Sequence, residues 1–448
     1  MTETLDTHRR ALAVNLDLST YGTFAEIGAG QEVARWFLQV GGAAGTVAQT
    51  ICAYDMAVSD AIYGKAGRYV SRDRLVEMLD HEYDALLSRL GSARGSKTRF
   101  FVFADTVSAR NYAGTNECHG WLGLRFQTKP GAQPSNVIVH VNLRDATNLQ
   151  QQEALGIAGV NLVYAAFFAL GKRGQTLDAL FSGLSLDRLE IDYVELTGPA
   201  FAGVDPRALG VELVHAGLAQ AVVLTREGKL APPNEFLRKS PIVFERRAER
   251  LGADASKRLN SAARQLAQEM PKLERAPLSL CEVPLIDAER AEPATAAMML
   301  KRCAEPGTRG LPVLVTRYPR IFELSAYLRR YTREPLVITL GVDKLIEILT
   351  AGASREEAAG AFEALGKLLN TNVRMFVEPR PAREVRAAVK KLGKAAGSVR
   401  FGDESTVGLA DLQLAPPLDH LLAYLVGSGC VVPLGAERAT KKRKRATT

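Results

Sequence analysis

The chain has 448 residues, of which 47% are apolar and 24% charged, and its formal net charge is +8 at pH 7. These proportions are those of an ordinary globular protein with a sizeable core, and they exclude a wholly disordered or collagen-like chain. At roughly 150 residues per domain, the length allows two or three domains, or one large α/β body with additions.

The positive charge is concentrated near the C-terminus, in one run: Lys441, Lys442, Arg443, Lys444 and Arg445. We expect residues 436–448 to form a basic, disordered tail. Such a run either holds an anionic partner, nucleic acid included, by releasing counterions, or it is a solvated end that keeps the protein soluble.

Cysteine usage and apolar windows bear on the compartment. The five cysteines include no C-x-x-C pair, and their odd number fits a disulfide framework poorly, so we expect reduced thiols in a cytosol. The N-terminus lacks a basic segment followed by an apolar one, which argues against a secretory signal. The most apolar windows, residues 160–170 and 421–432, are shorter than the ~20 residues of a membrane-spanning helix. A soluble, cytoplasmic protein without a membrane segment is predicted.

Residues 1–95 are predicted to form a helical N-terminal region. Apolar residues recur every three or four positions over residues 33–40 and again after Ser71, with a small-residue stretch at 41–46 between them. Residues 91–97, rich in Gly and Ser, are typical of a linker.

From residue 96 onward, short runs of β-branched and aromatic residues indicate strands. They lie at residues 99–104, 136–143, 189–196, 221–224, 313–315, 336–340 and 373–377. Helical patterns separate several of them, at residues 150–170, 207–218, 320–331 and 354–369. This alternation predicts an α/β protein with a mostly parallel sheet or a barrel-like core. The expected organisation is a helical region 1–95, an α/β core 96–270, a linker or excursion 271–308, a second core part 309–435 and the tail.

Several common catalytic motifs are missing from the sequence. No G-x-x-x-x-G-K-[ST] occurs, and Gly28-Ala29-Gly30 has no third glycine at the spacing of a dinucleotide-binding loop. His81-Glu82 begins like a zinc-protease helix, but Ala85 stands where the second histidine is needed. We therefore predict no metal site, and the sequence indicates no particular cofactor.

The densest polar region spans residues 105–145. Asp105 and Arg144 each follow a predicted strand, and sites in α/β proteins gather at the carboxyl ends of strands. His140 and Asn142 alternate with apolar neighbours and therefore share one face of their strand. His119 is suited to acid–base chemistry near neutral pH. The alternatives are a structural histidine in a strand and a turn capped by Asp105.

Two later segments add candidates. Arg317 directly follows the strand predicted at 313–315, and its guanidinium can bind a carboxylate or phosphate through two hydrogen bonds. Asp192 and Glu195 are further acids beside a Gly-Pro turn, whose chemistry also explains the segment without a function. An exposed turn is the alternative for Arg317.

Five segments carry a resemblance to a known family: residues 101–107 (F-V-F-A-D-T-V), 119–127, 151–167, 190–201 and 418–425. They resemble a bacterial family of poorly characterised proteins often labelled nicotinamide- or nicotinate-nucleotide adenylyltransferase, or outer-membrane receptor. The resemblance implies a nucleotide-like ligand. The chain lacks the motifs of both labels, since its one His-Gly pair, His119-Gly120, is not part of an H-x-G-H signature. No catalytic residue is carried over.

The sequence thus predicts a cytoplasmic α/β enzyme acting on an anionic small molecule of phosphorylated or nucleotide-like kind. Its catalytic candidates are Asp105, His119 and His140. Its substrate-binding candidates are Arg125, Asn142, Arg144 and Arg317, and all seven are expected to line one hollow. The alternatives are a homo-oligomeric scaffold, joined through the N-terminal region and residues 41–46, and nucleic-acid binding through the tail.

Overall fold

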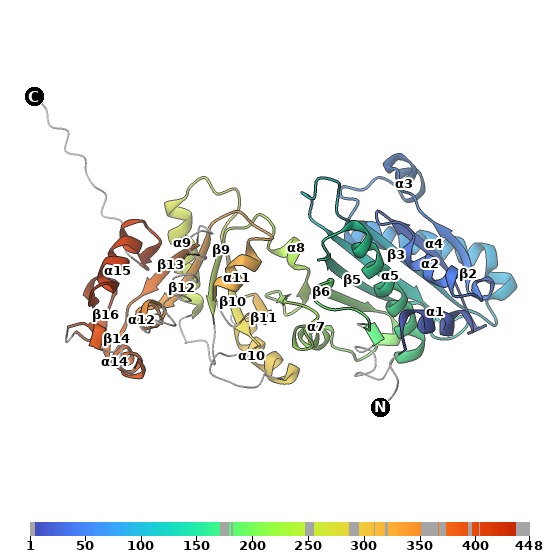
Figure 1. The fold of residues 1–448 in the computed structure, drawn as a ribbon. Helices are drawn as coiled ribbons and strands as arrows, with labels where there is room; N and C mark the ends of the chain where they lie inside the picture. The colour runs from blue at the N-terminus through green and yellow to red at the C-terminus, as the bar shows by residue number, and fades with distance from the viewer. Residues whose placement is uncertain are drawn as a thin grey trace, which may run out of the picture. The chain divides into compact units, whose positions relative to one another are not determined.

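The structure is a computed structural model with two compact units (Figure 1). The first comprises Met1–Val222, Leu230–Pro232 and Thr295–Leu300, and the second comprises Val223–Lys229, Pro233–Ala294 and Lys301–Thr448. The residues that the structure describes are 5–170, 179–180, 182–246, 255–285, 295–308, 310–318, 321–350, 366, 373–392, 397–402 and 404–435.

A six-stranded sheet in the order β2-β1-β3-β4-β5-β6 forms the centre of the first unit. Its strands are β1 (Thr20–Ile27), β2 (Val47–Ile51), β3 (Arg99–Ser108), β4 (His119–Phe126), β5 (Ser135–Leu143) and β6 (Leu189–Thr197). β2, β1 and β3 run parallel, whereas β3 to β6 form an antiparallel meander. The helices are α1 (Thr7–Asn15), α2 (Glu32–Gln39), α3 (Met56–Tyr63), α4 (Arg72–Arg94), α5 (Asn148–Tyr164) and α7 (Pro206–His215), with the π-turn η2 (Ala165–Ala169) and the short helices η1 (Ala43–Gly45) and η3 (Pro199–Phe201).

Helices cover both faces of this sheet. On one face α4 packs Leu75 and Met78 against Phe100 and Trp121, because its apolar residues recur at helical spacing. On the other face α2 and α5 contact each other over the aromatic residues of β1 and β3. Gly159 allows this close approach, since a Cβ there would collide with the side chain of Val33.

The helices begin where polar side chains cap them. Asp6 accepts a hydrogen bond from the amide of Arg9 at the start of α1, and Thr147 accepts from Gln150 at the start of α5. Ser71 caps α4 in the same way.

The second unit is built around an eight-stranded sheet in the order β18-β13-β12-β9-β10-β11-β7-β8. Its strands are β7 (Ala221–Leu224), β8 (Leu230–Ala231), β9 (Ile242–Arg246), β10 (Leu278–Pro284), β11 (Val313–Thr316), β12 (Leu336–Gly341), β13 (Val373–Glu378) and β18 (Val431–Pro433). The pairs from β18 through β11 are parallel. The helices are α8 (Pro233–Phe236), α9 (Ala255–Glu269), α10 (Ala296–Thr308), α11 (Ile321–Leu328), α12 (Val342–Thr350), α14 (Ala382–Lys391) and α15 (Leu418–Gly427), with the short η5 (Leu409–Asp411). Two small sheets pair β14 (Arg380–Pro381) with β16 (Thr406–Val407) and β15 (Val399–Arg400) with β17 (Gln413–Leu414).

The predicted α/β class is confirmed, although the first sheet is mixed rather than mostly parallel, and neither sheet closes into a barrel over the described residues. The prediction of a helical region 1–95 is wrong in part, because β1 and β2 lie within it. The expected linker at 91–97 falls mostly inside α4, and the expected linker 271–308 contains β10 and α10. The helix predicted at 354–369, apart from residue 366, and the basic tail 436–448 with Lys441–Arg445 lie outside the described residues.

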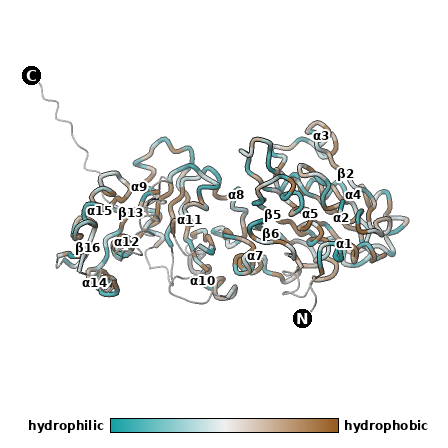
Figure 2. The backbone as a smooth tube through the Cα atoms, in the orientation of Figure 1, coloured by the Kyte–Doolittle hydropathy of each residue, from teal (hydrophilic) through white to brown (hydrophobic). Residues whose placement is uncertain are grey.

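Apolar residues line the strands and the inner helix faces in each unit (Figure 2). Within the described part of the chain, one helical stretch, Asn148–Ala169, has the length and composition to cross a membrane. Inside the protein, 67% of its most apolar window is buried, as expected for the core helix that packs under this sheet.

Candidate functional site

Two of the predicted catalytic histidines are in contact. Nδ1 of His119, the first residue of β4, lies 3.1 Å from Nε2 of His140 on β5. The other nitrogen of His140, Nδ1, lies 2.6 Å from Oδ1 of Asp192 on β6. Asn142 donates from Nδ2 to Oδ2 of the same carboxylate at 2.7 Å. We call Asn142, Asp192, His140 and His119 the histidine line.

A β-bulge explains how Asp192 joins this line. The β5–β6 register shifts between His140 and Val141, so that His140 is paired with Tyr193 and Val141 with Ile191. Asp192 is therefore the extra residue between two paired ones. Such a bulge twists the strand locally and re-aims a side chain, which here brings the carboxylate to the histidine of the neighbouring strand.

The hydrogen bonds define the proton positions in the line. A carboxylate only accepts, so His140 donates from Nδ1 to Asp192 and presents Nε2 as an acceptor to His119. His140 and Asp192 are fully buried, whereas His119 is 8% exposed. The ring of Trp121 packs against His140 at 4.9 Å between centroids and excludes water from the line. The arrangement can therefore orient His119 and stabilise a proton on it.

The third catalytic candidate, Asp105, lies elsewhere. It is paired with Glu26 across the parallel strands β3 and β1, at their carboxyl ends. Asp105 accepts from the amide of Ile27 at 3.2 Å, and Glu26 accepts from the amides of Val33 and Ala34 at 2.9 and 2.8 Å. Glu26 thereby caps the N-terminus of α2 from a neighbouring strand.

Burial perturbs both carboxyl groups of this pair. It raises the pKa of Glu26 from 4.5 to about 7, against the lowering effect of the α2 amides. The pKa of Asp105 is raised well above 3.8, first by burial and second by the charge of Glu26. Two neighbouring carboxyls with raised pKa values hold a proton near neutral pH, which is a property found at acid–base sites and also in sealed cores.

Asp105 and His140 do not share a hollow, so that expectation is wrong. His140 packs on the α4 face with Trp121, while Asp105 lies on the α2 face with Glu26. Successive strand residues point to opposite faces, and both side chains are buried within the unit.

The predicted arginines are already engaged or distant. Arg125 forms an ion pair with Asp80, and it lies six residues from His119 along β4, roughly 20 Å. Arg144 donates to Glu190 at 3.2 Å at the end of β5. Arg317 follows β11 in the second unit. Of the seven candidates, the structure thus brings together His119, His140 and Asn142.

An exposed loop leads directly into His119. Within it, Asn116 donates from Nδ2 to the carbonyl oxygen of Ala109 at 2.7 Å and accepts from the amide of Asn111 at 2.9 Å. Arg110 and Tyr112 of the same loop are exposed, and Tyr112 is fully so. The loop offers a cation and an aromatic ring beside the partly accessible end of the histidine line.

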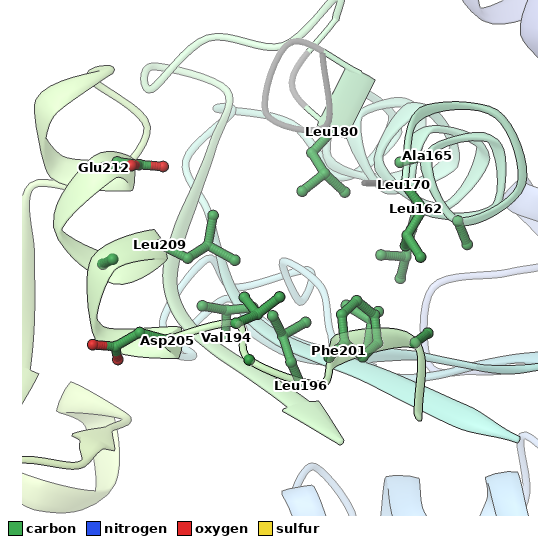
Figure 3. Close-up of a pocket in the computed structure, with 16 residues that line it drawn as sticks. Leu162, Ala165, Leu170, Leu180, Val194, Leu196, Phe201, Asp205, Leu209 and Glu212 are labelled. Atoms are coloured by element: carbon green, nitrogen blue, oxygen red, sulfur yellow. The ribbon is translucent and has the colours of Figure 1, made fainter. Parts of the chain in front are cut away.

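A separate pocket of about 370 Å³ opens on the α5 face of the same sheet (Figure 3). Its walls come from α5, η2, β5, β6, η3 and α7, and the sequence analysis did not find it. The lining residues are Val137, Leu162, Ala165, Ala166, Leu170, Leu180, Val194, Leu196, Ala200, Phe201, Gly203, Val204, Asp205, Ala208, Leu209 and Glu212.

Among the described residues, no group of three His, Cys, Asp or Glu side chains is placed to hold a metal ion. All five cysteine positions are described, and they hold thiols rather than disulfides.

No known protein family profile matches the chain, and no characterised protein matches it in sequence. Solved structures match part of it. A competence/damage inducible protein from Agrobacterium tumefaciens is 17% identical, and the match covers 36% of this chain and 96% of that one, with a TM-score of 0.27. A competence-damaged protein (CinA) superfamily protein from Enterobacter cloacae is 14% identical, covering 37% and 95% at a TM-score of 0.28. A competence or damage-inducible protein from Enterobacter asburiae is 15% identical, covering 36% and 99% at 0.27. None of the three carries either label of the family that the sequence resembles, and no residue role is taken from them.

Proposed function

We propose that the chain is a cytoplasmic α/β enzyme that uses His119 as an acid–base group on an anionic small molecule of phosphorylated or nucleotide-like kind. One observation carries this proposal. The Asp192 carboxylate, His140 and His119 form a continuous hydrogen-bonded line from the buried core to a partly exposed imidazole.

Each member of the line has a separate role in the proposed reaction. Asp192 holds His140 in one tautomer, and His140 orients His119 through their 3.1 Å contact. When His119 takes a proton from the substrate, the positive charge is stabilised through His140 by the buried carboxylate. His119 is the proposed catalytic residue, and the other two are positioning residues.

The proposed anionic substrate rests on the loop before His119. The exposed guanidinium of Arg110 suits a carboxylate or phosphate, and the exposed ring of Tyr112 suits a nucleobase or another flat group. Asp105, Arg125, Arg144 and Arg317 remain predictions of the sequence and have no part in this proposed site.

The experiment starts from the full chain purified from its own host and searched by native mass spectrometry for a retained small molecule. A panel of phosphorylated metabolites and nucleotides is then screened by thermal shift, and hits are tested for turnover. His119→Gln should lower turnover by about 10² or more, the usual effect of losing a general acid or base. His420→Gln, at a histidine whose side chain is 82% exposed, should not change it. Full activity of His119→Gln, or no anionic ligand in either search, would refute the proposal.

A second candidate function, self-association as a scaffold, is favoured by one exposed apolar cluster. Leu16, Leu18 and Leu38 are 66%, 84% and 53% exposed at the ends of α1 and α2. Asn15 ties these ends together by donating to the carbonyl oxygens of Phe37 and Gly41, both at 2.7 Å. A homo-oligomer in analytical ultracentrifugation that Leu18→Lys converts to a monomer would support this function, and a monomeric wild type would exclude it.

A further inference from the structure

The pocket in Figure 3 is distinct from the proposed active site, because the sheet separates the two. Val137 of β5 and Val194 of β6 face the pocket together with Leu162 of α5. His140, three residues after Val137, points to the α4 face, where it packs against Trp121.

Large apolar side chains around the pocket are left incompletely covered. The half-buried ones are Leu170, Leu180, Leu196, Phe201 and Leu209. Each comes from a different stretch of the first unit, and Figure 3 shows them turned toward the same hollow. A concave apolar surface of this size is typical of a small-molecule site rather than of scattered surface residues.

The charges at the pocket have one sign. Asp205 and Glu212 are the charged residues among the sixteen that line it, and none of the sixteen is Lys, Arg or His. Asp205 caps α7 and pairs with Arg207 at 2.8 Å, which lowers the pKa of its carboxyl and keeps it ionised. Glu212 lies one and a half turns further along α7, and its carboxyl group points into the hollow in Figure 3.

We propose that this pocket binds a small amphipathic molecule with an apolar body and a cationic amine head, the amine lying beside Glu212. At about 30 Å³ for each non-hydrogen atom, a volume of about 370 Å³ holds roughly ten to twelve such atoms. An unbranched chain of this length covers the leucines of the wall, while its ammonium group meets the acidic end. A carboxylate of the same length meets repulsion there.

The test compares three probes of equal length, decylamine, decanol and decanoate, all below their micelle concentrations. Their binding to the full chain is measured by isothermal titration calorimetry and by thermal shift. We expect decylamine to bind at least tenfold more tightly than decanoate, with decanol in between. Equal binding of decylamine and decanoate, or no binding of any probe, overturns the proposal.

Two variants locate the binding. Glu212→Gln should reduce decylamine to the affinity of decanol and leave decanol unchanged, whereas Glu235→Gln, at an exposed position of α8, should change neither. Leu209→Trp should fill the hollow and abolish binding of all three probes. Ala165→Leu serves the same purpose from η2 if the tryptophan variant fails to fold, as judged by circular dichroism. Retained decylamine binding in a folded filling variant would refute the site.

The same variants distinguish a different occupant. If a second copy of the chain covers the pocket, Leu209→Trp will dissociate an oligomer seen in analytical ultracentrifugation, and the probes will compete with assembly. That result would contradict the small-molecule proposal. Loss of turnover in His119→Gln, by contrast, leaves it untouched, so the two proposals can fail separately.

Discussion

Glu26 on β1 and Asp105 on β3 are paired directly across two parallel strands, so two carboxyl groups occupy one buried position at the carboxyl end of the sheet. Their side chains are 1% and 2% exposed. Close carboxylates cannot both ionise without a large electrostatic cost, so the folded unit retains a proton there that the unfolded chain releases.

This pair makes stability depend on pH in a defined direction. The folded pKa of Glu26, about 7, lies above its unfolded value of 4.5, so folding is favoured at low pH, and this contribution is lost as pH rises from about 4.5 through about 7. The expected loss is on the order of 3 kcal/mol, or roughly 5–10 °C in Tm for a unit of this size. Glu26→Gln should flatten the Tm curve between pH 4.5 and 8, and Glu117→Gln, at an exposed position, should leave it unchanged. Parallel curves for wild type and Glu26→Gln would contradict the buried pair.

Asp192→Asn tests the histidine line as a structural network. The amide still accepts from His140, but its NH₂ group then faces the NH₂ group of Asn142, which donates to Asp192 in the wild type. Two buried donors that oppose each other should cost about 1–3 kcal/mol of unfolding free energy. Guanidinium denaturation measures this loss. Asn136→Ala, at a partly exposed position of the same strand β5, should cost less than half as much, and equal costs would argue against the line.

Two helical glycines provide a matched pair for packing. A methyl group at Gly159 collides with Val33 where α5 crosses α2, so Gly159→Ala should destabilise by about 1–3 kcal/mol. Gly91 in α4 has open space around its Cα, and Gly91→Ala should instead stabilise by roughly 0.5–1 kcal/mol, because alanine restricts the unfolded chain. Thermal or chemical unfolding gives both signs. A neutral Gly159→Ala would mean that α5 does not approach α2 this closely.

The second unit holds a buried ion pair between β9 and β10. Arg246 donates to both carboxylate oxygens of Glu282, at 2.6 and 2.8 Å, and Thr316 donates to Oε1 of Glu282 at 2.7 Å. Glu282 is fully buried, so Glu282→Ala should cost about 3–5 kcal/mol by leaving the guanidinium without its counter-charge. Glu347→Gln, which removes the exposed pair with Lys344 on α12, should cost less than about 1 kcal/mol. Similar costs for the two changes in chemical denaturation would refute the buried pair.

Sequence pattern was sufficient for the strands that are covered on both faces. The runs at 99–104, 189–196 and 336–340 match β3, β6 and β12 closely, because continuous β-branched and aromatic residues have few other uses. It failed at β1 and β2. Glu26 interrupts the apolar run of β1, and its burial depends on amides of α2 that local pattern does not reveal.

The histidine contact could be predicted only in part. His119 and His140 stand out as histidines near strand ends, but their contact requires the register that pairs Trp121 with His140, and register is not legible in single strands. Asp192 was visible as an acid in a strand, whereas the bulge that brings it to His140 was not. The pocket gives no local signal, since its leucines look like ordinary core positions.

Strand β6 contributes to both sites of the first unit. Asp192 points from it into the histidine line, and Val194 and Leu196 point from it into the pocket. A molecule that alters the bulge when it fills the pocket must also alter how strongly His119 holds its proton. Thermodynamic reciprocity then requires the converse, so that protonation of His119 changes the affinity of the pocket, and the bulge acts as the joint of an allosteric relay one strand wide.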